Sequence, residues 1–196
     1  RGAIDKAFSL PQGAYCLHEI VHNELVVAEL KSKGVRFVDA LNEVPDNSVI
    51  LFSAHGVAPA IRLEAQKKNL KIIDATCPFV QKVHNAAMGF AEKSFDVVII
   101  GDESHAEVAG IVGAVKSVGR VNVVVIKSES DFCKLDAIKS DTIGVVSQTT
   151  MADEEVKKIV SLLSERFNVV SSAQVCNATK ERQAAVRRFS GDSLIV

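Results

Sequence analysis

Polar residues able to do chemistry recur at five points where a short apolar run ends and a helical pattern begins. These groups stand at residues 53–56, 74–78, 104–107, 147–150 and 175–179. In open parallel sheets, ligands bind outside the carboxyl ends of the strands, where helix N-termini supply N–H donors. The pattern therefore predicts five loops at one edge that converge on a single anionic ligand.

Four of the five histidines stand at predicted strand ends or helix starts, namely His18, His22, His55 and His105. One loop histidine is usually a surface residue, but four beside glycine and serine favour anion binding or proton transfer. Gly56 directly follows His55 and would let the backbone approach a ligand closely. His84 lies two turns into a predicted helix and is interpreted as structural.

Two of the four cysteines precede predicted helices: Cys77 comes before a proline, and Cys176 before a helix expected near Thr179. A helix N-terminus favours the thiolate, the form that ligates metals. The spacing alone leaves small buried thiols and a zinc site with a histidine as alternatives. Cys16 and Cys133 stand among apolar residues and are expected to be small buried side chains.

Glu107 follows His105 at the start of a helical pattern. It is expected to be either a first-turn carboxylate that stabilises the helix dipole or a proton donor paired with His105. Thr149 and Thr150 precede a helix expected to begin at Asp153, and at least one of them is expected to cap that helix.

Short β-branched runs alternate with longer helical patterns along the chain. Strands are predicted at 14–17, 35–38, 49–52, 71–74, 97–100, 121–126, 142–147 and 168–170, and helices at 24–33, 59–68, 79–93, 107–116 and 153–167. Such alternation is typical of α/β proteins whose parallel sheets are covered on both faces. We expect one α/β unit over 1–77, a second over 78–172 and the start of a third over 173–196, with a new strand beginning at 192.

The composition narrows the class of protein. The chain has 196 residues, 47% hydrophobic, which is enough for a packed core and excludes disorder. A net charge of −1, from 23 basic and 24 acidic residues, argues against nucleic-acid binding. Apolar runs such as 97–100 are far shorter than the ~20 residues of a membrane span. Without an apolar secretory signal, a reducing cytoplasm is the expected location.

Seven ordered motifs resemble one family. They are HEIVHN (18–23), VPD (44–46), SAHGV (53–57), DATCP (74–78) with KVH (82–84), HAE (105–107), QTT (148–150) and CNAT (176–179) with RQ (182–183). This text is similar to that of the 4-hydroxy-3-methylbut-2-enyl diphosphate reductases, also called IspH or LytB. The resemblance runs over residues 13–196, nearly the whole chain.

The resemblance implies repeated small three-layer α/β units, with mainly parallel sheets, arranged around a central cluster site. It implies an iron–sulfur oxidoreductase that converts 4-hydroxy-3-methylbut-2-enyl diphosphate to isopentenyl and dimethylallyl diphosphate in the non-mevalonate isoprenoid pathway. The implied cofactor is a 4Fe–4S cluster. The implied partners are the allylic diphosphate and an electron donor such as ferredoxin or flavodoxin, with no nucleic acid and no membrane.

Matched motif by motif, the resemblance also implies roles for individual residues. Cys77 and Cys176 match two of the family's three cluster ligands. The glutamate that delivers a proton matches Glu107, and the threonine near the substrate hydroxyl matches Thr149. The histidines that contact substrate match His22, His55 and His105.

The sequence departs from the family pattern in three places. The family's first cluster cysteine and its Ser-Ser-Asn segment have no counterpart here, so we expect an internal fragment that is inactive and lacks a stable cluster by itself. Asp102 stands where many members carry a histidine and is expected to tune the pocket. Two alternatives are a non-catalytic interaction module on the same scaffold, and a zinc-dependent hydrolase using Cys77, Cys176 and a histidine.

Overall fold

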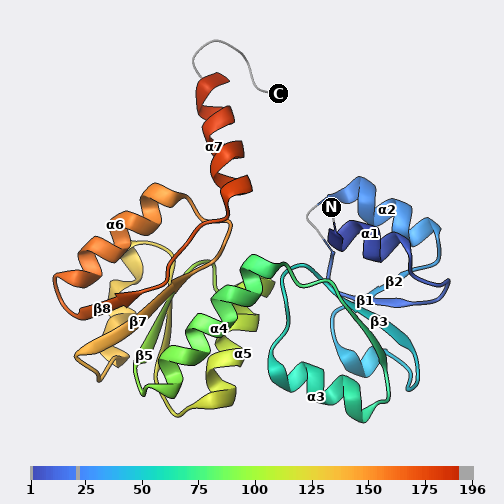
Figure 1. The fold of residues 1–196 in the computed structure, drawn as a ribbon, viewed down its shortest axis with the longest axis horizontal. Helices are drawn as coiled ribbons and strands as arrows, with labels where there is room; N and C mark the ends of the chain where they lie inside the picture. The colour runs from blue at the N-terminus through green and yellow to red at the C-terminus, as the bar shows by residue number, and fades with distance from the viewer. Residues whose placement is uncertain (1, 21–22, 190–196) are drawn as a thin grey trace.

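A computed structural model describes residues 2–20 and 23–189, which form two parallel four-stranded sheets joined by helices (Figure 1). The first sheet contains β1 (Tyr15–Leu17), β2 (Arg36–Val38), β3 (Val49–Phe52) and β4 (Lys71–Asp74). The second contains β5 (Asp96–Ile100), β6 (Val123–Ile126), β7 (Thr142–Ser147) and β8 (Asn168–Ser171). The predicted α/β class with parallel sheets is confirmed.

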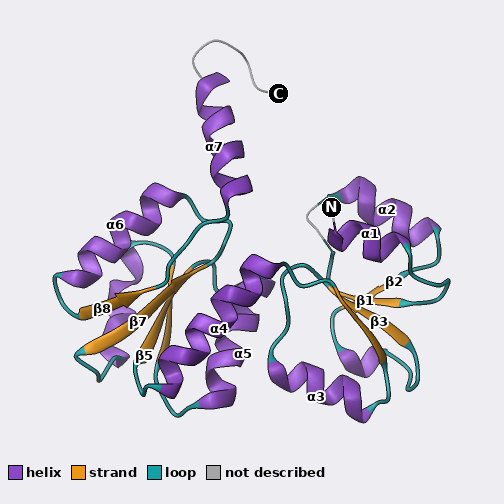
Figure 2. Cartoon of the chain, in the orientation of Figure 1, coloured by secondary structure: helices purple, strands orange, loops and turns teal. Residues whose placement is uncertain are grey.

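Helices cover both faces of each sheet (Figure 2). They are α1 (Gly2–Phe8), α2 (Glu24–Ser32), α3 (Pro59–Lys67), α4 (Pro78–Glu92), α5 (Ala106–Val118) and α6 (Asp153–Ser164), with 3₁₀ helices η1 (Leu41–Glu43) and η2 (Glu129–Ala137). Helix α7 (Asn177–Phe189) extends away from both sheets (Figure 1). Helix α6 ends three residues earlier than predicted, and the sequence did not indicate η1 or η2. The strand expected from 192 lies outside the described residues, and the division into units at 77/78 and 172/173 stays a prediction. Within the described part of the chain, no helix is both long and apolar enough to cross a membrane.

The two sheets repeat one topology. Their strand orders, β2-β1-β3-β4 and β6-β5-β7-β8, correspond strand for strand. In each sheet the order reverses between the two central strands, and a crevice opens at their carboxyl ends at such a reversal. The loops after β1 and β3, and those after β5 and β7, therefore occupy equivalent positions for ligand binding.

The core of the second sheet is packed on both faces. Alternate residues of β5 point to opposite sides. Ile99 packs with α4 and α5, whereas Val98 packs with α6, and both are fully buried. A Cβ on Gly144 of β7 would lie 2.3 Å from the Phe90 ring of α4, so only glycine lets that helix approach so closely.

Asp96 ties three segments together at the amino end of β5. Its carboxylate accepts backbone N–H bonds from Asn122 (2.8 Å), Lys139 (2.7 Å) and Ser140 (3.2 Å). Burial by itself raises the pKa of Asp96, but these bonds outweigh it and lower the pKa. We expect Asp96→Ala to lower the free energy of unfolding by about 3 kcal/mol, because three backbone N–H groups lose a charged acceptor. Urea unfolding measures this, with the exposed Asp141→Ala as the matched control, expected to stay within about 0.5 kcal/mol.

His84 lies on the buried face of α4, only 4% exposed, as its interpretation as structural requires. Burial, with a smaller contribution from the Arg62 charge, lowers its pKa from 6.5 to about 4. The unfolded chain therefore takes up a proton at this histidine before the folded chain does. The contribution of the neutral His84 to the free energy of unfolding is therefore fully present above pH 6.5 and is lost as the pH falls towards 4.

We expect this one group to cost up to about 3 kcal/mol of stability over that acid range, at ~1.4 kcal/mol for each pKa unit. The measurement is chemical unfolding of the wild type and His84→Gln at a series of pH values. Glutamine does not titrate, so the difference between the two curves isolates the histidine from the carboxylates. Parallel curves between pH 6.5 and 4 would contradict the assignment.

Candidate functional site

All five loops predicted to converge contribute to one cavity of about 580 Å³. Both cysteines that precede helices line it, and so do three of the other candidate residues. This set is Cys77, Cys176, His55, Glu107 and Thr149. Residues up to 121 positions apart (176 − 55) are thus gathered at the carboxyl ends of both sheets.

One backbone hydrogen bond fixes each cysteine loop to its neighbour. The Cys77 N–H donates to the Ala54 carbonyl (3.0 Å), and the Cys176 N–H donates to the Thr149 carbonyl (3.0 Å). Cys77 is the N-cap residue of α4 with Pro78 in the first turn, and Cys176 directly precedes α7. Both side chains are half-buried, which leaves their sulfur atoms reachable from the cavity.

The carboxylate of Glu107 binds Thr149. It accepts the Thr149 N–H at Oε1 (2.8 Å) and the Thr149 hydroxyl at Oε2 (3.0 Å), and the two residues are 1% and 5% exposed. Burial raises the pKa of Glu107 although the two bonds from Thr149 oppose the shift. A raised pKa lets a carboxyl hold its proton to a higher pH than an exposed glutamate does, which is the direction that a general acid requires.

One expectation about this loop is wrong. Neither threonine caps α6, whose N-cap is Ala152 without a side-chain bond; the Thr149 hydroxyl donates to Glu107, and Thr150 accepts from Gln148 Nε2 (2.7 Å). The contact that joins Glu107 to His105 involves the backbone, since the Glu107 N–H donates to His105 Nδ1 (3.1 Å). Thr149 has a tertiary partner in place of a local one, because the loop faces the start of α5.

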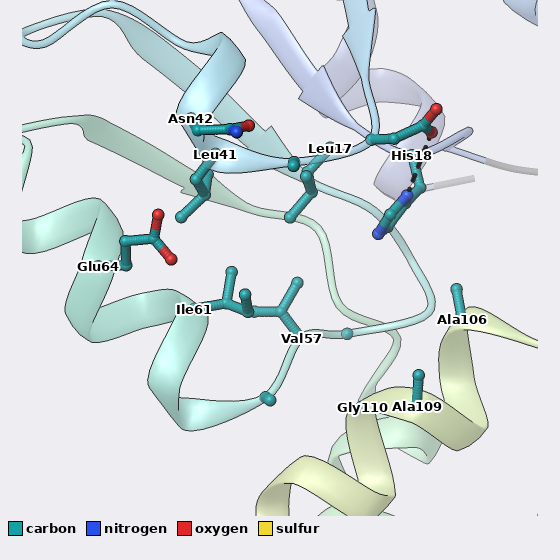
Figure 3. Close-up of a pocket in the computed structure, with 14 residues that line it drawn as sticks. Leu17, His18, Leu41, Asn42, Val57, Ile61, Glu64, Ala106, Ala109 and Gly110 are labelled. Carbon is teal, nitrogen blue, oxygen red and sulfur yellow. Dashed lines mark ion pairs between the residues drawn. The ribbon is translucent and has the colours of Figure 1, made fainter.

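The histidines divide between adjoining cavities. His55 also lines a second cavity of about 420 Å³ together with His18 and His105. Contrary to expectation, His105 does not line the first cavity. The His55 and His105 rings meet edge to face, with centroids 5.1 Å apart. His18 takes a left-handed φ of 59° and lies 3.6 Å from Asp39, the ion pair drawn in Figure 3. His22 lies outside the described residues.

Three further charged residues belong to this region, and of these only Asp102 was singled out from the sequence. Lys6 and Arg182 line the cysteine cavity and bring positive charge to it. Asp102, at the edge of the second cavity, accepts from Lys127 (2.7 Å), and that bond is the main reason its pKa is lowered. Arg182 stands in one of the quoted motifs, which was its only signal in the sequence; Lys6 had none.

The remaining cysteines lie elsewhere. Cys16 is buried as expected, with its thiol donating to the His18 carbonyl (3.2 Å), and burial raises its pKa to about 12. Cys133 is exposed, so the expectation of a buried side chain is wrong. In η2, with three residues per turn, Phe132 and Leu135 share the face that packs on the core, and Cys133 points away. Among residues 2–20 and 23–189, no group of three histidine, cysteine or acidic side chains is placed to hold a metal ion.

A family model described as LytB protein matches residues 2–196. The chain belongs to the LytB family. It is 36% identical over 185 residues to a 4-hydroxy-3-methylbut-2-enyl diphosphate reductase of Azotobacter vinelandii, covering 93% of this chain and 59% of the relative. It is 37% identical over 176 residues to the enzyme of the same name from Acinetobacter baumannii, covering 88% and 56%. The chain thus spans somewhat more than half the length of these LytB relatives.

Solved structures agree with this assignment. The E-1-hydroxy-2-methyl-but-2-enyl-4-diphosphate reductase of Plasmodium falciparum superposes with a TM-score of 0.83 at 32% identity, over 95% of this chain and 60% of that one. A second structure, of (E)-4-hydroxy-3-methyl-but-2-enyl diphosphate reductase, is described as the terminal enzyme of the non-mevalonate pathway. It gives a TM-score of 0.78 at 31% identity, over 95% and 66% of the two chains. The paired sheets described above are therefore the LytB arrangement.

Proposed function

We propose that this sequence carries the proton donor and two cluster ligands of a 4-hydroxy-3-methylbut-2-enyl diphosphate reductase. The observation behind the proposal is that Cys77, Cys176 and the Glu107–Thr149 pair meet at one cavity, in a chain of the LytB family. The reaction is a reductive dehydroxylation. The allylic alcohol takes up two electrons and two protons, its C–O bond breaks, and isopentenyl or dimethylallyl diphosphate and water are formed.

The thiols at the cavity fit part of an iron–sulfur centre. Cys77 and Cys176 line the same cavity, and iron–sulfur clusters are held mainly by thiolates. Cys16 is buried elsewhere and Cys133 is exposed on η2, so a third thiolate would come from outside this set of four cysteines. When bound, a 4Fe–4S cluster with one open iron would supply electrons and a Lewis acid for the substrate hydroxyl.

The other residues of the cavity divide the remaining tasks. Glu107 gives a proton to the departing oxygen, so that water leaves instead of hydroxide. Thr149 orients the Glu107 carboxyl through its two bonds. His105 helps to fix the geometry beside Glu107. The diphosphate is anionic, and we assign it to His22, His55 and the helix N-termini.

Anaerobic preparation, followed by iron and acid-labile sulfide analysis and a turnover assay, tests this proposal on an enzyme of the relatives' full length that contains this sequence. We expect iron and sulfide in equal amounts and reduction of the allylic diphosphate. Bound zinc without sulfide, together with a hydrolytic activity, would favour the zinc-dependent hydrolase instead. An enzyme that binds no metal and shows no turnover would favour the non-catalytic interaction module.

The proposed reaction needs an electron donor, and the cysteines bear on where the protein works. A small one-electron carrier such as ferredoxin or flavodoxin is the partner we propose, since the reaction needs two electrons at low potential. The cytoplasmic location is proposed on the pattern of free cysteines, because none of the four forms a disulfide in the described structure.

A further inference from the structure

A joint of very small residues brings the two sheets' loops together. On one side are Gly56 and Ala58, in the loop between β3 and α3, and on the other are Gly110 and Gly113 of α5. A Cβ on Gly113 would lie 2.3 Å from the Ala58 Cβ, so the helix and the loop touch almost backbone to backbone. Val57 of the loop and Gly110 of α5 also line a neighbouring cavity of about 480 Å³ (Figure 3).

The His84 ring, which comes from α4, touches both sides of this joint. A Cβ on Gly110 would lie 3.0 Å from His84 Cε1 and 3.2 Å from Nε2. A Cβ on Gly56 would lie 3.4 Å from the same Cε1 atom, and Gly56 also needs its left-handed φ of 74°. At Gly110 a side chain would crowd the ring, whereas at Gly56 the ring lies at ordinary contact distance and the left-handed φ is what requires glycine. The ring thus touches both the loop and the helix and acts as a spacer between them.

His84 Nε2 is buried and has no hydrogen-bond partner among the residues that the structure describes. A buried nitrogen without a hydrogen-bond partner lowers the free energy of unfolding. The stability of the core therefore does not explain why a histidine, and not an apolar residue, stands at this position. Arg62 is the charged group that acts on the ring, and with its lowered pKa His84 is neutral at physiological pH. The ring therefore acts on its surroundings through its shape.

The joint carries the candidate catalytic residues on its two sides. His55 directly precedes Gly56, and Glu107 lies one helical turn before Gly110 on α5, whose N-cap is His105. A change in the gap between Gly56 and Gly110 would therefore change the distance from His55 to His105, whose rings are in contact. The His84 ring is thus close to the site on both sides: Gly56 adjoins His55 in the loop, and Gly110 lies one turn from Glu107 on α5.

We propose that His84 is a positioning residue that sets the separation between the His55 loop and the His105–Glu107 end of α5. The inference rests on the proposed function for its catalytic meaning. The separation itself can be measured without turnover. Since His84 touches neither the cysteines nor the substrate cavity, its effect is exerted through His55 and α5.

Nuclear magnetic resonance of the 196-residue chain near neutral pH tests the separation, using the cross-relaxation between the His55 and His105 ring protons. We expect His84→Ala to lose most of this signal and His84→Gln to keep it, because glutamine reaches the same space. Gly89→Ala on the same helix is the matched control, since a Cβ there meets nothing within 4 Å. It should leave the ring signal unchanged.

Gly110→Ala tests the same spacer if His84→Ala does not fold. Its methyl group would press on the His84 ring while leaving every other side chain of the joint in place, and we expect a weakened ring signal in a folded chain. A folded His84→Ala or Gly110→Ala that keeps the full His55–His105 signal would overturn the proposal.

In an enzyme of full length, His84→Ala should reduce kcat by up to about 10²-fold, the scale of a 1 Å misplacement, with the iron content unchanged. His84→Gln should restore most of that loss. An inactive wild type whose ring signal still depends on His84 would refute the proposed function and leave the spacer intact. An active wild type whose kcat is indifferent to His84→Ala would refute the positioning role alone.

Discussion

Replacing Cys77 or Cys176 by serine should abolish iron binding and with it all reductase turnover. A serine hydroxyl matches the thiol in size but is not deprotonated at neutral pH, and iron–sulfur clusters depend on thiolate ligands. Each variant should fold, because the loop at either cysteine is fixed by a backbone N–H bond, to Ala54 or to Thr149, that serine retains. We therefore expect loss of metal with a change in stability of less than about 1 kcal/mol.

The measurement is iron and sulfide per chain after anaerobic reconstitution of an enzyme of the relatives' full length that contains this sequence, with urea unfolding in parallel. Cys133→Ser is the matched control, because that thiol is exposed on η2 and does not line the cavity. Its iron content should equal that of the wild type. Full iron content in Cys77→Ser or Cys176→Ser would show that the cluster, if present, uses other ligands.

Glu107→Gln should lower turnover by ~10²-fold or more, the usual scale of general acid catalysis, while leaving iron content unchanged. Glutamine keeps the shape and can still accept the Thr149 N–H bond, but it has no proton to give. The pH profile carries a second signature. Because burial raises the pKa of Glu107, wild-type turnover should fall on the alkaline side as the carboxyl loses its proton, and Glu107→Gln should lack that limb.

Glu103→Gln is the control for this variant, since Glu103 is an exposed carboxylate of the same loop that pairs with Lys134. It should retain wild-type turnover and the wild-type pH profile. Wild-type rates in Glu107→Gln would remove this residue from the mechanism. A loss of iron in that variant would mean that the carboxyl supports the metal site instead of the proton transfer.

Several features of the molecule could be read from local patterns in the chain. Short runs such as Val97–Ile100 are β-branched and bounded by polar residues, and each became a strand within one or two residues of the predicted ends. Helix α5 and the strand before it were likewise predicted, so the position of Glu107 in a first helical turn was known. Such signals depend on residues within a few positions of one another, which a single sequence displays directly.

Two of the errors arose from local rules. The threonines at 149 and 150 have the composition of an N-cap, yet Thr149 binds a carboxylate 42 positions away. Cys133 was expected among its apolar neighbours, but a 3₁₀ helix in place of a regular pattern turned it outward. For Thr149 the local rule failed because a distant segment supplies the bonding partner, and for Cys133 it failed because the local helix has a different period from the one expected.

The sequence by itself determined the alternation of strands and helices, the polar groups at the strand ends and the motifs shared with the LytB family. The convergence of Cys77 and Cys176 on one cavity was also expected from the sequence, and the structure confirms it. Only the tertiary structure decided the bonds from Thr149 to Glu107 and the contacts of the His84 ring with Gly56 and Gly110. The reason is physical. Hydrophobic periodicity acts along the chain and is visible in it, whereas contacts between loops depend on how closely two sheets pack, which here is set by glycines that carry no pattern of their own.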